Sequence, residues 1–152
     1  MGLIWKIKRF NELSVAELYE VLQLRSEVFV VEQNCIYQDI DCKDEKAVHV
    51  IGTYNGQVAA YCRIFKPGDY YDQEASIGRV AVKEAFRDKK WGHDLIREAI
   101  LAIETHFGES RITISAQLYL KKFYESHGFI TAGGEYLEDG IPHIEMKRNG
   151  TS

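Results

Sequence analysis

A strand, a charged loop and a helix follow one another between residues 77 and 107, and this order constrains the fold more than any other feature of the chain. The strand pattern covers residues 77–82, the loop covers residues 87–92, and the amphipathic helix pattern begins at Trp91. The first N–H groups of a helix have no partners within the helix, and the helix dipole favours negative charge there. A basic loop at the start of a helix therefore suits a phosphate-bearing ligand. Taken alone, residues 87–92 are equally consistent with a solvated surface loop.

Composition indicates one globular domain that spans residues 1–152, with 45% hydrophobic and 28% charged residues. A net charge of -4 disfavours a nucleic-acid-binding surface. The three cysteines show no paired C-x-x-C spacing, which disfavours a disulfide framework and a structural metal site. No signal-peptide pattern and no apolar run of membrane-spanning length is visible. We therefore expect a cytoplasmic protein that binds neither membrane, nucleic acid nor metal.

Helix, strand and turn patterns alternate along the chain without a linker or a repeat. Ser14 and Glu17 form a capping box, which predicts the start of the first helix. Asn-Gly at residues 55–56 and Asp-Gly at residues 139–140 stand between strand patterns and predict two hairpins. Hairpins combined with crossover helices predict an α/β (α+β) domain with a mixed sheet. The other strands are expected at residues 5–10, 75–82 and 111–115, and two later helices at residues 91–107 and 118–127. The apolar residues that recur at helical spacing in the first helix are Val15, Leu18, Tyr19, Leu22, Val28 and Phe29.

This order of elements resembles the GNAT N-acetyltransferases over nearly the whole chain. Residues 24–33, 77–80 and 138–143 resemble the ElaA-like branch of that family in particular. The resemblance implies the GNAT acyl-CoA N-acyltransferase fold, a mixed and mostly antiparallel sheet flanked by helices. Its fourth and fifth strands, here residues 75–82 and 111–115, are expected to splay apart.

The resemblance also implies acetyl-CoA as the co-substrate. Its pantetheine arm would pair with main-chain groups of Val80, Ala81 and Val82, which would also polarise the thioester carbonyl. The pyrophosphate would bind the loop and the start of the helix, formed by Arg87, Asp88, Lys89, Lys90, Trp91, Gly92 and His93. The loop departs from the family pattern Arg/Gln-x-x-Gly-x-Gly/Ala because Lys90 replaces the first glycine. Lys90 must then adopt a backbone conformation that suits glycine, or the loop must take another path, and its ammonium could pair with a phosphate.

Tyr124 matches the family's proton donor to the departing thiolate. Gln117 stands seven residues before it, where the family commonly has an Asn that holds the pantetheine arm. An amide that is one methylene longer makes similar hydrogen bonds. Alone, Tyr124 would be interpreted as core packing, since aromatic residues at helical spacing usually face the core. Its register with Gln117 and with Gly128-Phe129 favours the catalytic interpretation.

The acceptor end of the site is less defined. Acidic residues crowd one connection and either attract a protonated amine or are simply solvated; they are Glu32, Asp39, Asp41, Asp44 and Glu45. His143 follows Pro142 and is titratable near neutral pH, although it could also only cap a hairpin. We predict Glu32 or His143 as the base that removes the amine's proton.

These observations predict an N-acetyltransferase that moves the acetyl group of acetyl-CoA to a small-molecule or peptidyl primary amine. The amine would attack directly in a ternary complex. The alternative is a non-catalytic acyl-CoA-binding or sensing module, which Lys90 favours and Tyr124 opposes. A homodimer is a further expectation, since dimers are the commonest oligomers.

Overall fold

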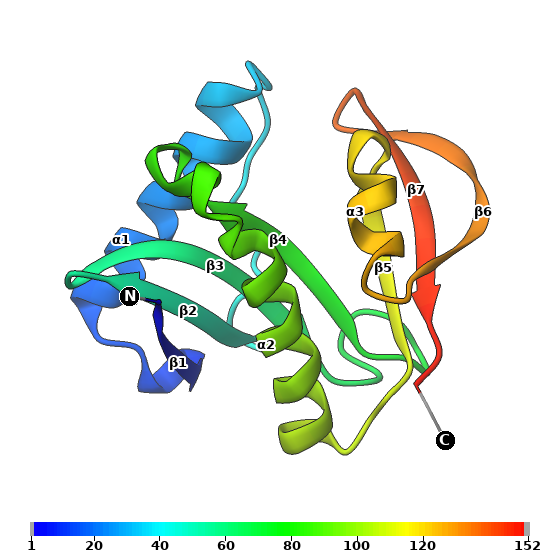
Figure 1. The fold of residues 1–152 in the computed structure, drawn as a ribbon, viewed down its shortest axis with the longest axis horizontal. Coiled ribbons are helices and arrows are strands. Elements are labelled where there is room, and N and C mark those ends of the chain that lie inside the picture. The colour runs from blue at the N-terminus through cyan, green and yellow to red at the C-terminus, as the bar shows by residue number, and fades with distance from the viewer. Residues whose placement is uncertain (1, 151–152) are drawn as a thin grey trace.

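Two antiparallel sheets form the framework of the computed structural model, which describes residues 2–150 (Figure 1). The first sheet has the order β1-β2-β3-β4 and the second the order β5-β7-β6. The strands are β1 (Ile4–Arg9), β2 (Val48–Tyr54), β3 (Gln57–Phe65), β4 (Ser76–Val82), β5 (Ile112–Gln117), β6 (Ile130–Glu138) and β7 (Ile141–Arg148). The helices are α1 (Val15–Arg25), its continuation as the π-helix η2 (Ser26–Glu32), α2 (Trp91–Phe107) and α3 (Lys121–Glu125). Short 3₁₀ turns are η1 (Phe10–Glu12), η3 (Glu84–Lys89) and η4 (Leu118–Leu120).

The fourth and fifth strands separate along their length, as the sequence predicts. They are joined at their starts, where Ala75 forms an isolated parallel bridge with Ile112. The Ala75 N–H donates to the Arg111 carbonyl at 3.0 Å, and the Thr113 N–H donates to the Ala75 carbonyl at 2.9 Å. In Figure 1 the two strands meet at the lower end and diverge upwards. The predicted mixed, mostly antiparallel arrangement with splayed central strands is confirmed.

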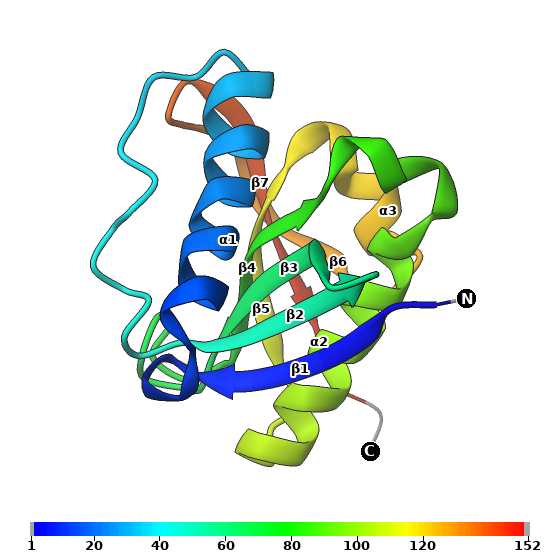
Figure 2. The same cartoon turned by 90° about the vertical axis from the view of Figure 1, so that its left-hand side faces the viewer.

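Helices cover both faces of the first sheet (Figure 2). β3 lies in the middle of the molecule, and Ala60, Cys62 and Ile64 face α2 in the larger of two hydrophobic clusters. Tyr61, on the opposite face of β3, packs with Val21 of α1 in the smaller cluster. Because β3 is buried on both faces, it holds α1 and α2 in fixed positions on either side of β4.

Local turn chemistry explains why several elements begin and end as predicted. The Ser14 hydroxyl accepts a hydrogen bond from the Glu17 N–H, and the Glu17 carboxylate accepts one from the Ser14 N–H. Asn55 and Gly56 have φ values of 50° and 78°, the left-handed pair that a two-residue hairpin needs. α2 ends at Gly108, which has φ of 63°.

The predicted buried face of the first helix is wrong in part. Val15 and Tyr19 are 88% and 73% exposed, whereas the side chains that α1 buries belong to Val21, Leu24 and Arg25. Because Arg25 on the buried face is charged, the spacing of apolar residues did not identify that face.

Element lengths differ in two further places. The helix predicted at residues 118–127 is shorter in the structure. It consists of the 3₁₀ turn η4 followed by α3, which has five residues. β5 extends to Gln117, two residues beyond the predicted strand.

Candidate active site

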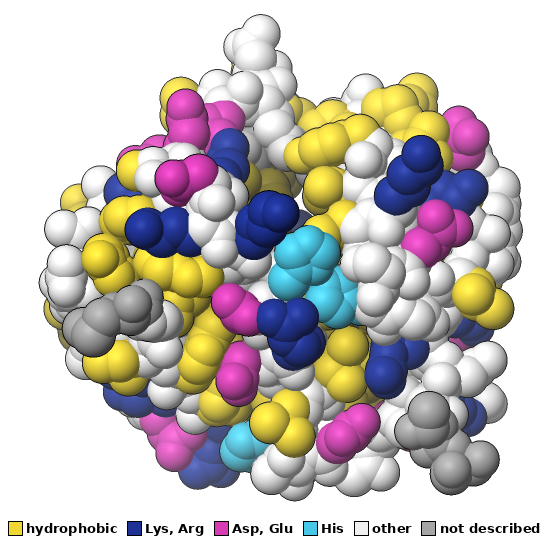
Figure 3. Space-filling model, in the orientation of Figure 1, with side chains coloured by type: hydrophobic (Ala, Val, Ile, Leu, Met, Phe, Trp, Pro, Cys, Tyr) yellow, Lys and Arg dark blue, Asp and Glu magenta, His cyan; other side chains and the backbone are white. Residues whose placement is uncertain are grey.

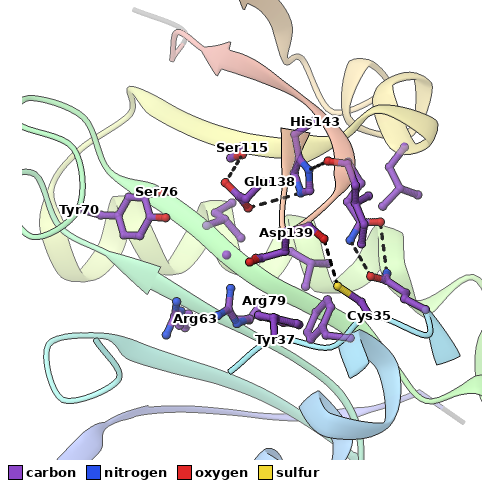
Figure 4. A pocket seen from close by; sticks show the side chains of 18 of the residues that line it. Cys35, Tyr37, Arg63, Tyr70, Ser76, Arg79, Ser115, Glu138, Asp139 and His143 are labelled. Carbon is purple, nitrogen blue, oxygen red and sulfur yellow. Dashed lines mark hydrogen bonds and ion pairs between the residues drawn. The ribbon is translucent and has the colours of Figure 1, made fainter. Parts of the chain in front are cut away.

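A cavity of about 110 Å³ lies between the splayed strands. β4 contributes Gly78, Arg79 and Val80 to one wall, and Gln117 and Tyr124 lie on the other. Figure 4 shows Glu138 and Asp139 pointing into this space from the β6–β7 turn, opposite Arg79 and Tyr37. The further lining residues are Phe29, Gln33, Cys35, Arg63, Phe65, Tyr70, Ser76, Ile77, Ser115, Leu120, Ile141 and His143.

A β-bulge shapes the β4 wall. The register changes between the pairs Tyr61–Ala81 and Arg63–Gly78, so that two residues of β4, Arg79 and Val80, oppose one residue of β3. Arg79 has φ of 52°, a left-handed conformation that is costly for a residue with a Cβ. The bulge lets both residues line the cavity.

Main-chain groups near the end of β4 alternate in direction. The Lys83 N–H donates to the Ala59 carbonyl at 2.8 Å, and two residues earlier Ala81 stands opposite Tyr61. Because every second residue of an antiparallel strand faces the same neighbour, Ala81 is turned towards β3 and Val82 towards the opening. The position of Val82 agrees with the predicted pantetheine contact, whereas that of Ala81 gives it no support.

The loop before α2 has the backbone path that the first glycine of the family pattern would adopt, although Lys90 stands at that position. Lys90 has φ of 58° and ψ of 31°, a left-handed conformation, and the helix starts directly after it at Trp91. The Lys89 ammonium lies 5.7 Å from the centre of the Trp91 ring, Asp88 is exposed, and Gly92 lies in the first turn of α2 against Phe123. The loop therefore keeps the geometry expected of a phosphate-binding turn despite the substitution.

Arg87, the first residue of the predicted phosphate loop, points back towards the protein. Its Nε donates to the Val82 carbonyl at 3.0 Å, and its Nη1 lies 2.7 Å from Glu32 Oε2. Glu32 is thus neutralised by Arg87 and is not among the residues that line the cavity. The structure places His143 in the cavity but does not bring Glu32 to it, so the position of Glu32 does not support its predicted role as base.

His93, in the first turn of α2, is tied to the end of α3. Its Nδ1 lies 2.9 Å from His127 Nε2, and its ring packs against Phe123. Histidine and basic side chains gather in the middle of the face seen in Figure 3. Burial lowers the pKa of His127, and His93, Arg97 and Arg148 nearby lower it further. His93 therefore links the two helices, and its contact with a cofactor stays a prediction.

Tyr124 is a buried phenol on the wall of the cavity. Its ring is buried and packs edge-on against Phe123 and Phe129, with ring centres 5.1 and 5.8 Å apart. Burial raises the pKa of its hydroxyl, so the phenol stays protonated at neutral pH. Gln117 lies on the same wall, and its Oε1 accepts a hydrogen bond from Gln33 Nε2 at 3.2 Å. This amide pair connects the end of η2 with the end of β5 across the opening.

Three of the acidic residues predicted to attract an amine are paired with arginines instead. Arg25 Nε lies 2.9 Å from Asp39 Oδ2, and Arg25 Nη1 lies 2.7 Å from Asp44 Oδ1. Arg63 binds Asp44 at 2.8 Å and also binds Asp41, while Arg79 binds Asp39 at 2.7 Å. Glu45 is exposed. The prediction of an amine-attracting acidic cluster is therefore wrong for Asp39, Asp41 and Asp44, whose charges are balanced inside the protein.

Sequence reasoning missed several cavity residues. Tyr37 and Tyr70 come from irregular segments with no periodic pattern, so nothing in the sequence indicated their direction. Ser115 and Glu138 belong to predicted strands or turns, and Glu138 opens the segment 138–143 already noted for its resemblance. The resemblance of that segment is the signal in the sequence that points to Glu138.

Residues 2–150 contain neither a cluster of metal-ligating side chains nor a membrane-spanning helix. Within residues 2–150 no group of three or more His, Cys, Asp or Glu side chains is arranged to hold a metal ion. In the same part of the chain, every helix is too short or too polar to cross a membrane.

Comparisons with known proteins agree with this geometry. Residues 12–149 match the family model described as an acetyltransferase (GNAT) domain. The protein ElaA of Escherichia coli (strain K12) is 44% identical over 146 residues, which cover 95% of each chain. The crystal structure of Escherichia coli ElaA has a TM-score of 0.89, with 97% of this chain and 99% of that one covered. An acyl-CoA N-acyltransferase from Pseudomonas aeruginosa is 40% identical, with a TM-score of 0.91 and the same coverage. The chain belongs to the GNAT acetyltransferase family.

Proposed function

We propose that the protein transfers the acetyl group of acetyl-CoA to a primary amine, carried by a small molecule or a peptide, by direct attack in a ternary complex. The observation that carries the proposal is the opening between β4 and β5. There Val80 on one side faces a cavity that Gln117 and Tyr124 line on the other. Membership of the GNAT family supports acyl transfer as the general chemistry.

The residues present fit acetyl-CoA. The Val82 N–H is turned to the opening, whereas its carbonyl accepts from Arg87, and Gln117 offers an amide to the pantetheine arm. The left-handed conformation of Lys90 ends the loop, and the first N–H groups of α2 follow directly after it, where they can bind a phosphate. Acetyl-CoA would supply an acyl group that is already activated as a thioester.

The chain's own groups account for the proton transfers. An alkyl ammonium has a pKa of about 10.4 and must lose a proton before its nitrogen can attack. His143 lines the cavity and is the base that we propose for this step. Tyr124, which stays protonated because it is buried, gives its proton to the departing thiolate.

Turnover across a panel of amines tests the proposal. We expect thiol release from acetyl-CoA that depends on an added amine, such as a polyamine, an arylalkylamine or a lysyl peptide, together with the acetylated amine by mass spectrometry. Binding of acetyl-CoA by calorimetry without release of thiol for any amine would favour the acyl-CoA-binding module. Absence of binding would contradict both functions.

The role of Lys90 can be separated into its charge and its backbone. In Lys90→Gly the left-handed conformation becomes free of strain, so we expect the free energy of unfolding to stay within about 1 kcal/mol of the parent. If the ammonium pairs with a phosphate, the Kd for acetyl-CoA rises several-fold at low salt and by less at high salt, since exposed charge pairs are screened.

Lys90→Ala is the matched control for this experiment. It removes the same charge but keeps a Cβ in the left-handed conformation. Its Kd for acetyl-CoA should therefore equal that of Lys90→Gly, while the backbone strain at this position remains. Calorimetric Kd values equal to the parent's at both salt concentrations would show that Lys90 does not bind phosphate.

A further inference from the structure

One nitrogen of the His143 ring is hydrogen-bonded to the main chain. His143 Nδ1 lies 2.7 Å from the Ile141 carbonyl oxygen. A carbonyl oxygen only accepts hydrogen bonds, so Nδ1 must carry the proton. Nε2 of the neutral ring is then unprotonated and is the atom that can accept a proton.

That free nitrogen faces a carboxylate. His143 Nε2 lies 3.5 Å from Glu138 Oε2 across the β6–β7 hairpin. The backbone of His143 pairs with Gln117 of β5 on one side and with Tyr136 of β6 on the other. The Tyr136 ring also stacks on the imidazole, with ring centres 6.1 Å apart.

A chain of hydroxyl groups holds the carboxylate. The Ser115 hydroxyl donates to Glu138 Oε1 at 3.1 Å (Figure 4). The Tyr136 hydroxyl contacts Ser115 Oγ. Because the Ser115 proton goes to Glu138, Tyr136 is the donor to Ser115. Glu138 therefore stands on the cavity wall with one oxygen anchored and the other next to His143.

The charge of Glu138 remains available to a cation in the cavity. The three aspartates below the cavity are balanced by Arg25, Arg63 and Arg79. Among the ion pairs of residues 2–150, Glu138 pairs with His143 alone. A positive charge formed on the imidazole thus has one carboxylate beside it.

We propose that Glu138 is the positioning residue that allows His143 to act as the base, an inference that rests on the proposed function. The acceptor's ammonium N–H bond breaks and its proton forms a bond with His143 Nε2, directly or through one water. The electron pair stays on the amine nitrogen, which attacks the acyl carbon. As the C–S bond breaks, the thiolate takes the proton of Tyr124, and the nitrogen's second proton returns to the Tyr124 oxygen directly or through water. The imidazolium that results lies beside Glu138 Oε2, while Ile141 keeps the other nitrogen in place.

Other titratable and charged groups face His143 from the elements around the cavity. Beside Glu138 of β6, and Tyr136, which stacks on the ring, they are the cavity residues Cys35, Tyr37, Arg63, Tyr70, Arg79, Tyr124 and Asp139. Arg79 is bound to Asp39 and Asp41, and Cys35 donates to the Asp139 carbonyl, so Glu138 is the carboxylate with direct contact to the ring.

The test compares Glu138→Gln with Glu145→Gln. Glu145 is the matched control because it lies on β7 two residues from His143, opposite Ser115, and does not line the cavity. We expect kcat/KM for a basic alkylamine to fall about two- to five-fold in Glu138→Gln, since a charge pair with a partly exposed carboxylate typically contributes about that much. The acid limb of the kcat/KM profile should move to lower pH, because the protonated ring loses its carboxylate partner. Ser115→Ala, which only loosens Glu138, should change both in the same direction by less.

A weakly basic acceptor separates proton removal from structure. Trifluoroethylamine is largely unprotonated at neutral pH and needs little help from a base, so Glu138→Gln and the parent should acetylate it at similar rates. Equal pH profiles for Glu138→Gln and Glu145→Gln, with the parent active, would overturn the inference and leave the proposed function standing. An equal loss with both amines would show a structural role and also overturn it. A parent that acetylates no amine would overturn the proposed function and this inference together.

Discussion

Replacing Tyr124 with Phe is expected to lower kcat by about 10²–10⁴-fold, the usual cost of a lost general acid. The ring keeps its packing against Phe123 and Phe129, and only the hydroxyl is removed. The Kd for acetyl-CoA and the melting temperature should therefore change little. Steady-state kinetics with an accepted amine, together with calorimetric binding, measure both quantities.

Tyr119→Phe is the matched control for this change. Tyr119 lies in η4, five residues before Tyr124, and its side chain is 74% exposed. Its hydroxyl should be dispensable for turnover. If Tyr124→Phe were as active as Tyr119→Phe, the thiolate would leave without help and Tyr124 would serve packing alone.

Replacing Arg25 with Met is expected to lower the free energy of unfolding by about 3 kcal/mol, because two buried carboxylates each lose one of their two arginine partners. Arg25 is fully buried and binds Asp39 and Asp44. Met keeps much of the side-chain volume, so the loss reports the charge rather than a cavity. Urea unfolding followed by circular dichroism measures it.

Arg97→Met is the control for a general effect of losing an arginine. Arg97 pairs with Asp94 on the exposed face of α2, where such pairs contribute about 1 kcal/mol or less. Equal stability of the two variants would show that the buried network does not support the fold.

The same network should make stability depend on pH in acid. Burial alone would raise the pKa of Asp44, but hydrogen bonds and charge from Arg25 and Arg63 outweigh it, so the pKa is lowered. Arg63 likewise outweighs burial at Asp41 and lowers its pKa. A carboxyl with a lowered folded-state pKa stabilises the protein above its unfolded value of about 3.9, and this stabilisation is lost as the pH falls towards the folded value.

We therefore expect the free energy of unfolding to fall steeply below about pH 4, and to fall less steeply in Arg25→Met, where Asp44 has lost one of its two arginines. Urea titrations at a series of pH values measure this slope. Equal slopes in the parent and the variant would contradict the assignment of these pKa shifts to the arginine network.

Local patterns predicted most of the fold, because the interactions that decide them are close in sequence. The capping box at Ser14 and the Asn55-Gly56 hairpin depend on residues a few positions apart. The splay of β4 and β5 was expected only through resemblance to a family, since no local pattern specifies where two strands part.

Contacts between distant segments explain what the sequence did not reveal. Arg25, Arg63 and Asp44 belong to three different elements, so their pairing is set by tertiary packing. The same holds for Glu32, which the sequence placed at the acceptor and the structure pairs with Arg87, 55 residues away. The sequence around acidic residues in a connection does not indicate which arginine will form an ion pair with them.

A crystal structure with CoA bound would test the central claim, that the opening between β4 and β5 is the acyl-transfer site, most directly. We expect the pantetheine arm between the Val82 main chain and Gln117, the pyrophosphate at the turn formed by Lys90, and the thiol within hydrogen-bond distance of the Tyr124 hydroxyl. CoA bound elsewhere, or a thiol out of reach of both Tyr124 and the cavity that holds His143, would contradict it.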